Sequence, residues 1–202
     1  MTFETRVAAG LLAGVVATAA FAIYLRSTFR GQTKPNRATW WILTVVGFML
    51  AGSYHSLGAR HTIWLAVSYA LCPLVTAIVS LKHGEGGWTQ FDRACLIVAG
   101  ISAVLWWLCH SPLVALLINL FIDFVGLLPT IRKSHERPAS ENRIAWLIAF
   151  LASVLNLFAV ERWEFAIAVY PLYMALGNGV IAVLLYRRRE EPVVSTKADG
   201  ES

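Results

Sequence analysis

Residues 113–131 read LVALLINLFIDFVGLLPTI, a run of 19 residues that contains a single ionisable side chain, Asp123. The hydrocarbon core of a bilayer is about 30 Å thick, and an α-helix of about 20 apolar residues crosses it. A carboxylate inside such a segment is costly and marks a functional position by default. The stretch therefore predicts a membrane-spanning helix and also the residue around which function is organised.

Six further apolar runs flank this stretch. They are residues 7–25, 39–59, 63–81, 94–109, 143–160 and 163–186. The chain is 57% hydrophobic and only 14% charged, whereas soluble domains carry about 25% charged residues. Only helices and closed barrels span lipid, and uninterrupted runs of this length are typical of helices. We predict an all-α integral membrane protein with seven transmembrane helices, which excludes a soluble enzyme and a nucleic-acid binder.

Lysine and arginine are unevenly distributed between the two sides of these runs. Of the 17 basic residues, 14 fall in the loops after the first, third and fifth runs or in the C-terminal tail, and Arg6, Arg60 and Arg162 fall on the other side. Basic loops stay in the cytoplasm. We therefore predict an N-out, C-in multi-pass protein of the plasma (bacterial inner) membrane, and the net charge of +5 reports its orientation. The alternative is that the first run is a cleaved signal peptide. Cleavage would place the basic loop after this run on the translocated side, against the charge distribution, so we favour a membrane-spanning helix.

The chain also contains a weak internal repeat. Residues 30–41 and 133–146 each hold a basic cluster, then a proline, then a tryptophan that opens the next run, and the third run of each half carries Tyr-Pro elements, 69–73 and 170–171. Three-helix units joined by one linking helix have the same orientation, which makes a parallel repeat. We predict a 3+1+3 arrangement with the following parts. Residues 1–93 form the first bundle and its following loop, 94–110 the linker helix, 111–186 the second bundle, and 187–202 a disordered cytoplasmic tail.

This plan resembles the SWEET and PQ-loop (MtN3-like) transporter superfamily. Residues 123–130, DFVGLLPT, are similar to the proline-containing signature that closes the first helix of each bundle, with threonine in place of the usual glutamine. Residues 24–27 of the first bundle have no proline at the equivalent place. The resemblance implies a small-solute carrier that works by alternating access. It also implies substrate binding by an asparagine in the third helix of a bundle, here Asn178, and proton coupling through an acid near Asp123.

Further candidate substrate ligands come from the residues themselves. Asn119 lies four residues before Asp123, so the two share one helix face, and Asn156 is a second amide inside an apolar run. Tyr170 and Tyr173 lie one turn apart in the last run and could stack on a ring. The alternative for each asparagine is that it holds neighbouring helices together.

Proton coupling has two candidates, because a buried carboxyl such as Asp123 can titrate near neutral pH and a histidine does so by nature. His55 lies towards the outer end of the second run, where it could equally sit at the wet interface. Three prolines inside runs, Pro73, Pro129 and Pro171, are candidate hinges because proline frees a backbone carbonyl.

Catalytic chemistry is not expected. The last run has no lysine for a retinal Schiff base, there is no His-Glu-x-x-His, and no second carboxylate lies well inside a run. We expect no metal, no cofactor and no enzyme activity. The expected partners are a small polar solute and the bilayer, and a homo-oligomer with one pathway per protomer fits the short chain. The open alternatives are a seven-helix receptor or sorting factor and a passive channel.

Overall fold

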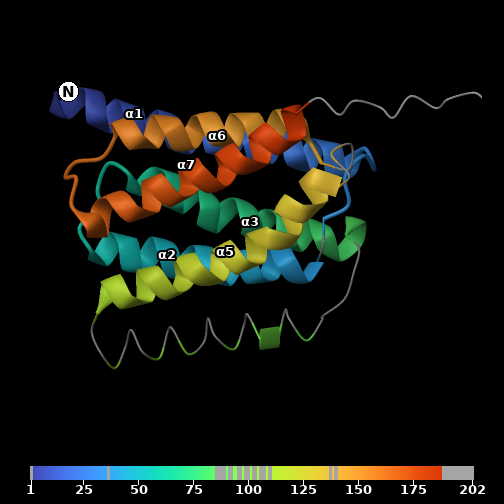
Figure 1. Cartoon of the computed structure of the whole chain (residues 1–202), viewed down its shortest axis with the longest axis horizontal. Helices are drawn as coiled ribbons and strands as arrows, with labels where there is room; N and C mark the ends of the chain where they lie inside the picture. The colour runs from blue at the N-terminus through green and yellow to red at the C-terminus, as the bar shows by residue number, and fades with distance from the viewer. Residues whose placement is uncertain are drawn as a thin grey trace, which may run out of the picture.

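The computed structural model describes residues 2–35, 37–84, 111–136, 138 and 141–187, together with the isolated positions 90, 93, 94, 97, 101, 104 and 108. Within these residues the chain is all-α, with six helices (Figure 1). They are α1 (Phe3–Phe29), α2 (Arg37–Ser56), α3 (Ile63–His83), α5 (Pro112–Glu136), α6 (Arg143–Phe158) and α7 (Phe165–Tyr186). The predicted run 94–109, apart from isolated positions, and the tail beyond 187 lie outside the described residues.

The helices follow the apolar runs but extend beyond several of them. α1 begins at Phe3 rather than at residue 7 because the Thr2 hydroxyl accepts a hydrogen bond from the Thr5 backbone N–H, which satisfies one of the free donors of the first turn. The helix continues to Phe29, and Gly31 then turns the chain with a φ of 70°. Capping groups, rather than the end of the apolar run, therefore set the length of this helix.

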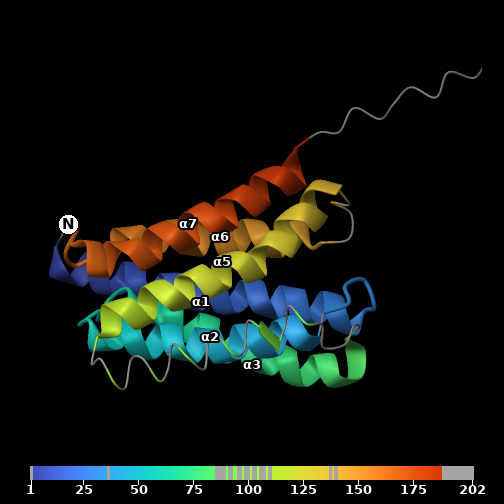
Figure 2. The same cartoon turned by 60° about the horizontal axis from the view of Figure 1, so that its bottom comes forward.

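Two helices each pack between two others. α3 contacts α1 and α2, whereas α7 contacts α5 and α6. These are two three-helix groups, α1 with α2 and α3, and α5 with α6 and α7. They meet mainly where α1 contacts α6 and where α2 contacts α5, with a smaller contact between α3 and α6. Figure 2 shows α5, α6 and α7 together on one side of the molecule and α1, α2 and α3 on the other.

Glycines allow these helices to approach closely. A Cβ atom at Gly10 in α1 would lie 1.9 Å from the carbonyl oxygen of His61, and one at Gly47 in α2 would lie 2.4 Å from the carbonyl oxygen of Tyr69. Both neighbours are backbone atoms, so only a residue without a side chain fits at either place. This is the use of small residues that is typical of helix packing in membranes.

The surface of the bundle is apolar. Three of the described helices, α1, α3 and α7, are long and apolar enough to cross a membrane, as expected of a multi-pass membrane protein. Large apolar side chains on these helices point outward, among them Leu12, Val15, Leu71, Ile78, Leu176 and Val183. Soluble monomers rarely expose apolar patches of this extent. Among the described residues, Asp123 is the one acidic or basic side chain near the middle of a helix.

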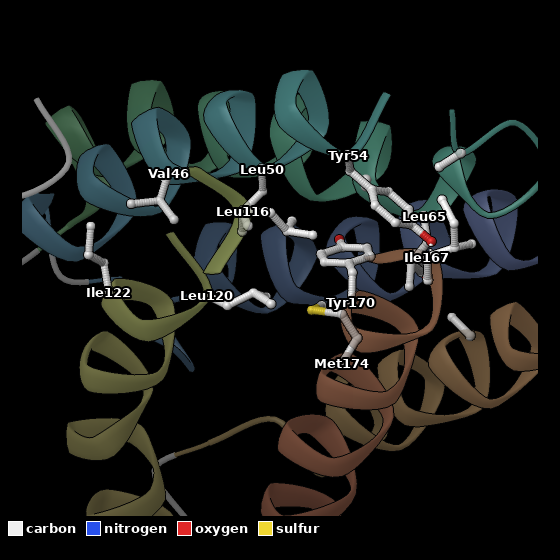
Figure 3. Packing of buried hydrophobic residues seen from close by; sticks show 14 of the residues in the cluster. Val46, Leu50, Tyr54, Leu65, Leu116, Leu120, Ile122, Ile167, Tyr170 and Met174 are labelled. Carbon is white, nitrogen blue, oxygen red and sulfur yellow. Dashed lines mark hydrogen bonds between the residues drawn. The ribbon is translucent and has the colours of Figure 1, made fainter. Parts of the chain in front are cut away.

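The largest buried side chains gather where α2, α3, α5 and α7 meet. Figure 3 shows Leu116 of α5 beside Leu50 of α2, and the ring of Tyr54 next to that of Tyr170. Both tyrosines are almost completely buried, at 0% and 1% exposure. This core lies beside the cavity described next and closes it on one side.

Candidate functional site

A cavity of about 110 Å³ lies at the centre of the bundle, and residues of all six described helices line it. The first three helices contribute four aromatic side chains, Phe21 and Tyr24 from α1, Trp40 from α2 and Tyr69 from α3. The Phe21 and Tyr69 rings meet edge to face with centroids 5.2 Å apart, and the Tyr24 and Trp40 rings lie 5.1 Å apart. These contacts hold the four rings as one aromatic wall.

The opposite wall carries the carboxylate. Asp123 from α5, Trp146 from α6, and Tyr170, Tyr173 and Asn178 from α7 all line the cavity. The Tyr173 hydroxyl donates a hydrogen bond of 2.5 Å to Oδ2 of Asp123. Among the described residues, no Lys, Arg or His lines the cavity. The site therefore combines one carboxylate with aromatic and apolar surroundings.

Asn178 is a second polar residue at the cavity, and its hydrogen bonds connect the two three-helix groups. Asn178 Nδ2 donates to the Tyr69 hydroxyl at 2.9 Å and to the Ser153 hydroxyl at 2.8 Å, and Ser153 donates in turn to the Ala149 carbonyl in α6. Because an amide NH₂ has two hydrogens, both donors of Asn178 are in use. These bonds fix α7 against α3 and α6 beside the cavity.

The cavity is closed toward the α2–α3 and α6–α7 loops. The Tyr54 ring packs against the Tyr170 ring, with centroids 4.9 Å apart and planes tilted by 43°. The Tyr54 hydroxyl donates to the Ile167 carbonyl and lies 2.7 Å from the Thr62 hydroxyl. Leu65 is completely buried in the same layer. These buried side chains lie between the cavity and the two loops.

A carboxylate outside the cavity fastens the two loops to each other. Oε1 of Glu161, in the α6–α7 loop, accepts hydrogen bonds from the backbone N–H groups of Arg60, at 2.7 Å, and of His61. The Arg6 guanidinium donates to the Glu161 carbonyl at 2.8 Å, which adds the start of α1. We call this set of contacts the Glu161 latch. It links both three-helix groups at the closed end.

The opposite end of the cavity is less covered. Tyr24, Trp40 and Trp146 are only half-buried and lie near the helix ends that border the basic loops. At the same end, Arg37 donates from Nε to the Ser80 carbonyl and from Nη2 to the Gly84 carbonyl, both at 3.1 Å. A guanidinium at the C-terminus of α3 is favourable because it faces the negative end of the helix dipole.

Four of the predicted site residues come together at the cavity, namely Asp123, Tyr170, Tyr173 and Asn178. Asn119 is completely buried but does not line it, and donates to the Ala115 carbonyl in its own helix at 2.8 Å. Asn156 is also completely buried away from the cavity.

The two side-chain polar atoms of Asn156 have no hydrogen-bond partner among the described residues. His55 is exposed near the end of α2 and does not line the cavity. Of the predicted hinges, Pro73 lines the cavity within α3, and Pro171 is buried within α7. Pro129 falls in α5, and its side chain lies outside the described residues.

The sequence reasoning missed several lining residues. Tyr69 and Ser153 complete the hydrogen bonds of Asn178. Trp40 and Trp146 line the cavity, although the sequence marked them only as the tryptophans that open their runs. The weak sequence repeat offered a way to find Tyr69 and the two tryptophans. Tyr69 matches Tyr170, and Trp40 matches Trp146, so a lining role for one member of a pair predicts one for the other.

Metal binding finds no support in the described part of the chain, where no group of three or more His, Cys, Asp or Glu side chains could hold an ion. Comparison of the sequence and structure with protein-family models, with curated proteins and with solved structures finds no match.

Proposed function

We propose that this protein is a membrane carrier that moves a small solute by alternating access, with the central cavity as its binding site. The observation that carries the proposal is a cavity bordered by all six described helices and containing a lone carboxylate, Asp123. Membrane pockets that hold an ionisable residue mark substrate or ion pathways. Closure of one end by Tyr54 and Tyr170, with half-buried Trp40 and Trp146 at the other, suits the state of a carrier that faces one side.

The proposed architecture is the 3+1+3 parallel repeat of seven helices, oriented N-out and C-in in the plasma membrane. Support comes from the packing, because α3 lies between α1 and α2 as α7 lies between α5 and α6. The matching contacts of α1 with α6 and of α2 with α5 suit two repeats related by an axis along the membrane normal. The resemblance to SWEET and PQ-loop carriers, and residues 94–110 as the linker, belong to the same proposal.

Alternating access requires that the closed end can open. In the proposed cycle the Glu161 latch and the Tyr54–Tyr170 contact separate, while the tryptophan end closes over the solute. The three-helix groups then move relative to each other about the cavity. Asp123 is the proposed coupling residue if protons take part, since it borders the cavity, whereas His55 does not.

The test is solute counterflow in proteoliposomes that contain the purified full chain. Vesicles are loaded with a mixture of small polar metabolites, and uptake of each labelled component is followed against protein-free vesicles. Saturable uptake that is accelerated by internal solute identifies a carrier. Uptake that never saturates identifies a channel, and binding without flux identifies a receptor, and either result would refute the proposal. Asp123→Asn, with His55→Asn as the matched control, tests coupling, because only the former should flatten the pH profile.

A further inference from the structure

We infer that the solute is a small organic cation, an amine or quaternary ammonium without an anionic group of its own. This inference rests on the proposed function for its transport aspect and names the substrate class of the same cavity. It follows from three features of the lining, which are its charge, its aromatic content and the state of its hydrogen-bond donors.

The charge of the lining has one sign. Asp123 is the one charged side chain that borders the cavity among the described residues. Tyr173 donates to Oδ2 of Asp123, and no described residue hydrogen-bonds the other carboxylate oxygen, Oδ1. An unpaired charge in an apolar site is costly, and a ligand of opposite charge removes that cost. Either a proton on the carboxylate or a bound cation removes it, and among ligands a cation is therefore the class that the charge of the site favours.

The aromatic content suits the same ligand. Seven aromatic side chains line the cavity, of which Phe21, Trp40 and Tyr69 lie on the wall formed by α1, α2 and α3. A ring face attracts a cation, and such contacts gain strength where water is excluded. Ammonium groups with methyl substituents are recognised by aromatic cages in this way. A carboxylate on one wall and rings on the other surround a cation from both sides.

The other common solute classes fit less well. Anions, and the carboxylate of an amino acid, would face Asp123 with no basic side chain to pair with in the described lining. A sugar needs many hydrogen bonds, but both N–H donors of Asn178 are taken by Tyr69 and Ser153. Polar ligand groups that are left without partners in a buried site weaken binding strongly.

The size of the cavity favours a compact ligand. A cavity of about 150 Å³ accommodates benzene, so the 110 Å³ here suits a compact ion. Tetramethylammonium and choline are suitable probes of this class. The neutral alcohol 3,3-dimethylbutanol has nearly the shape of choline with carbon in place of the charged nitrogen, and it is the matched control for charge.

Binding is measured by calorimetry and thermal shift on the detergent-purified full chain, with sodium chloride at equal ionic strength as the blank. We expect tetramethylammonium or choline to bind with a Kd of about 1 mM or tighter and the neutral alcohol at least about tenfold more weakly. Asp123→Asn should weaken cation binding by about 10- to 100-fold. Trp40→Leu should weaken it by about 2- to 30-fold.

Equal binding of choline and the neutral alcohol, or no binding of either cation, would overturn the inference. This comparison uses the unmodified protein, so it decides the matter even if Asp123→Asn fails to fold. The proposed function fails separately. Cations that bind but show no counterflow refute the carrier and leave the cation site intact, whereas counterflow of a neutral or anionic solute without cation binding refutes the cation site alone.

Discussion

The contact between α2 and α3 at Gly47 provides a quantitative test of the helix packing. In Gly47→Ala the new methyl carbon would lie 2.4 Å from the Tyr69 carbonyl oxygen and 3.1 Å from the Ala70 Cα atom. Both are backbone atoms, so no rotation of a side chain relieves the clash. The two helices must separate until the 2.4 Å distance reaches the 3.4 Å at which ordinary contacts begin.

The expected cost follows from comparison with a second glycine. A Cβ atom at Gly126 in α5 would meet nothing within 4 Å, so Gly126→Ala changes only the backbone preference, which favours alanine by up to about 1 kcal/mol in a helix interior. Gly47→Ala has the same gain but adds overpacking, which costs about 1–3 kcal/mol. The difference between the two variants therefore isolates the clash.

Thermal unfolding of both variants in the same detergent, at a fixed scan rate, measures this difference. For a chain of 202 residues, 1–3 kcal/mol corresponds to about 2–12 °C. We expect Gly47→Ala to unfold at a temperature lower than Gly126→Ala by that amount. If Gly47→Ala unfolds at the same or a higher temperature, α2 and α3 do not approach at Gly47 as described, and the reasoning from backbone contact fails.

Three further substitutions test single contacts by the same unfolding measurement. Tyr54→Phe keeps the ring but leaves the Ile167 carbonyl without its donor, and should lower stability by about 1–3 kcal/mol; an unchanged midpoint would mean that water replaces the hydroxyl. Arg37→Met removes both hydrogen bonds to the C-terminal carbonyls of α3 and should cost about 1–2 kcal/mol, with Arg37→Lys between it and the wild type if the helix dipole contributes. Glu161→Ala should cost about 2–3 kcal/mol, whereas Glu161→Gln, which keeps an acceptor oxygen, should remain close to the wild type, and equal losses in both would point to charge rather than geometry.

The helices could largely be predicted from the sequence, because apolar runs of bilayer length have few alternatives. Their ends could not. α5 continues to Glu136, beyond the apolar run that ends at residue 131, because a helix persists into polar sequence until its backbone groups find other partners. The Glu161 latch could not be predicted from the sequence either, since it depends on contact between a loop carboxylate and backbone N–H groups about 100 residues earlier in the chain.

For the site, polarity within apolar sequence was a good guide to Asp123, Tyr173 and Asn178. It gave no indication for Trp40 and Trp146, because a tryptophan near a helix end can anchor at the interface or turn inward, and its place along the chain does not decide its direction. Asn119 and Asn156 show the reverse error, in that a buried amide need not border a cavity. Whether a side chain lines the cavity or is buried elsewhere depends on the direction in which it points around the helix axis, rather than on its depth within the apolar run.

The α1–α6 and α2–α5 contacts, the two most extensive between the three-helix groups, differ in the size of their buried side chains. α1 and α6 bury only glycine, alanine, serine, threonine and asparagine, while Val46, Leu120 and Ile122 belong to the core on the α2 and α5 side. Small side chains make shallow ridges that can slide past each other with little change of rotamer, but branched ones interlock. If the two groups move relative to each other, we therefore expect α1 and α6 to slide along their interface. The interlocked side chains of α2 and α5 would stay in contact and act as the pivot of the rotation.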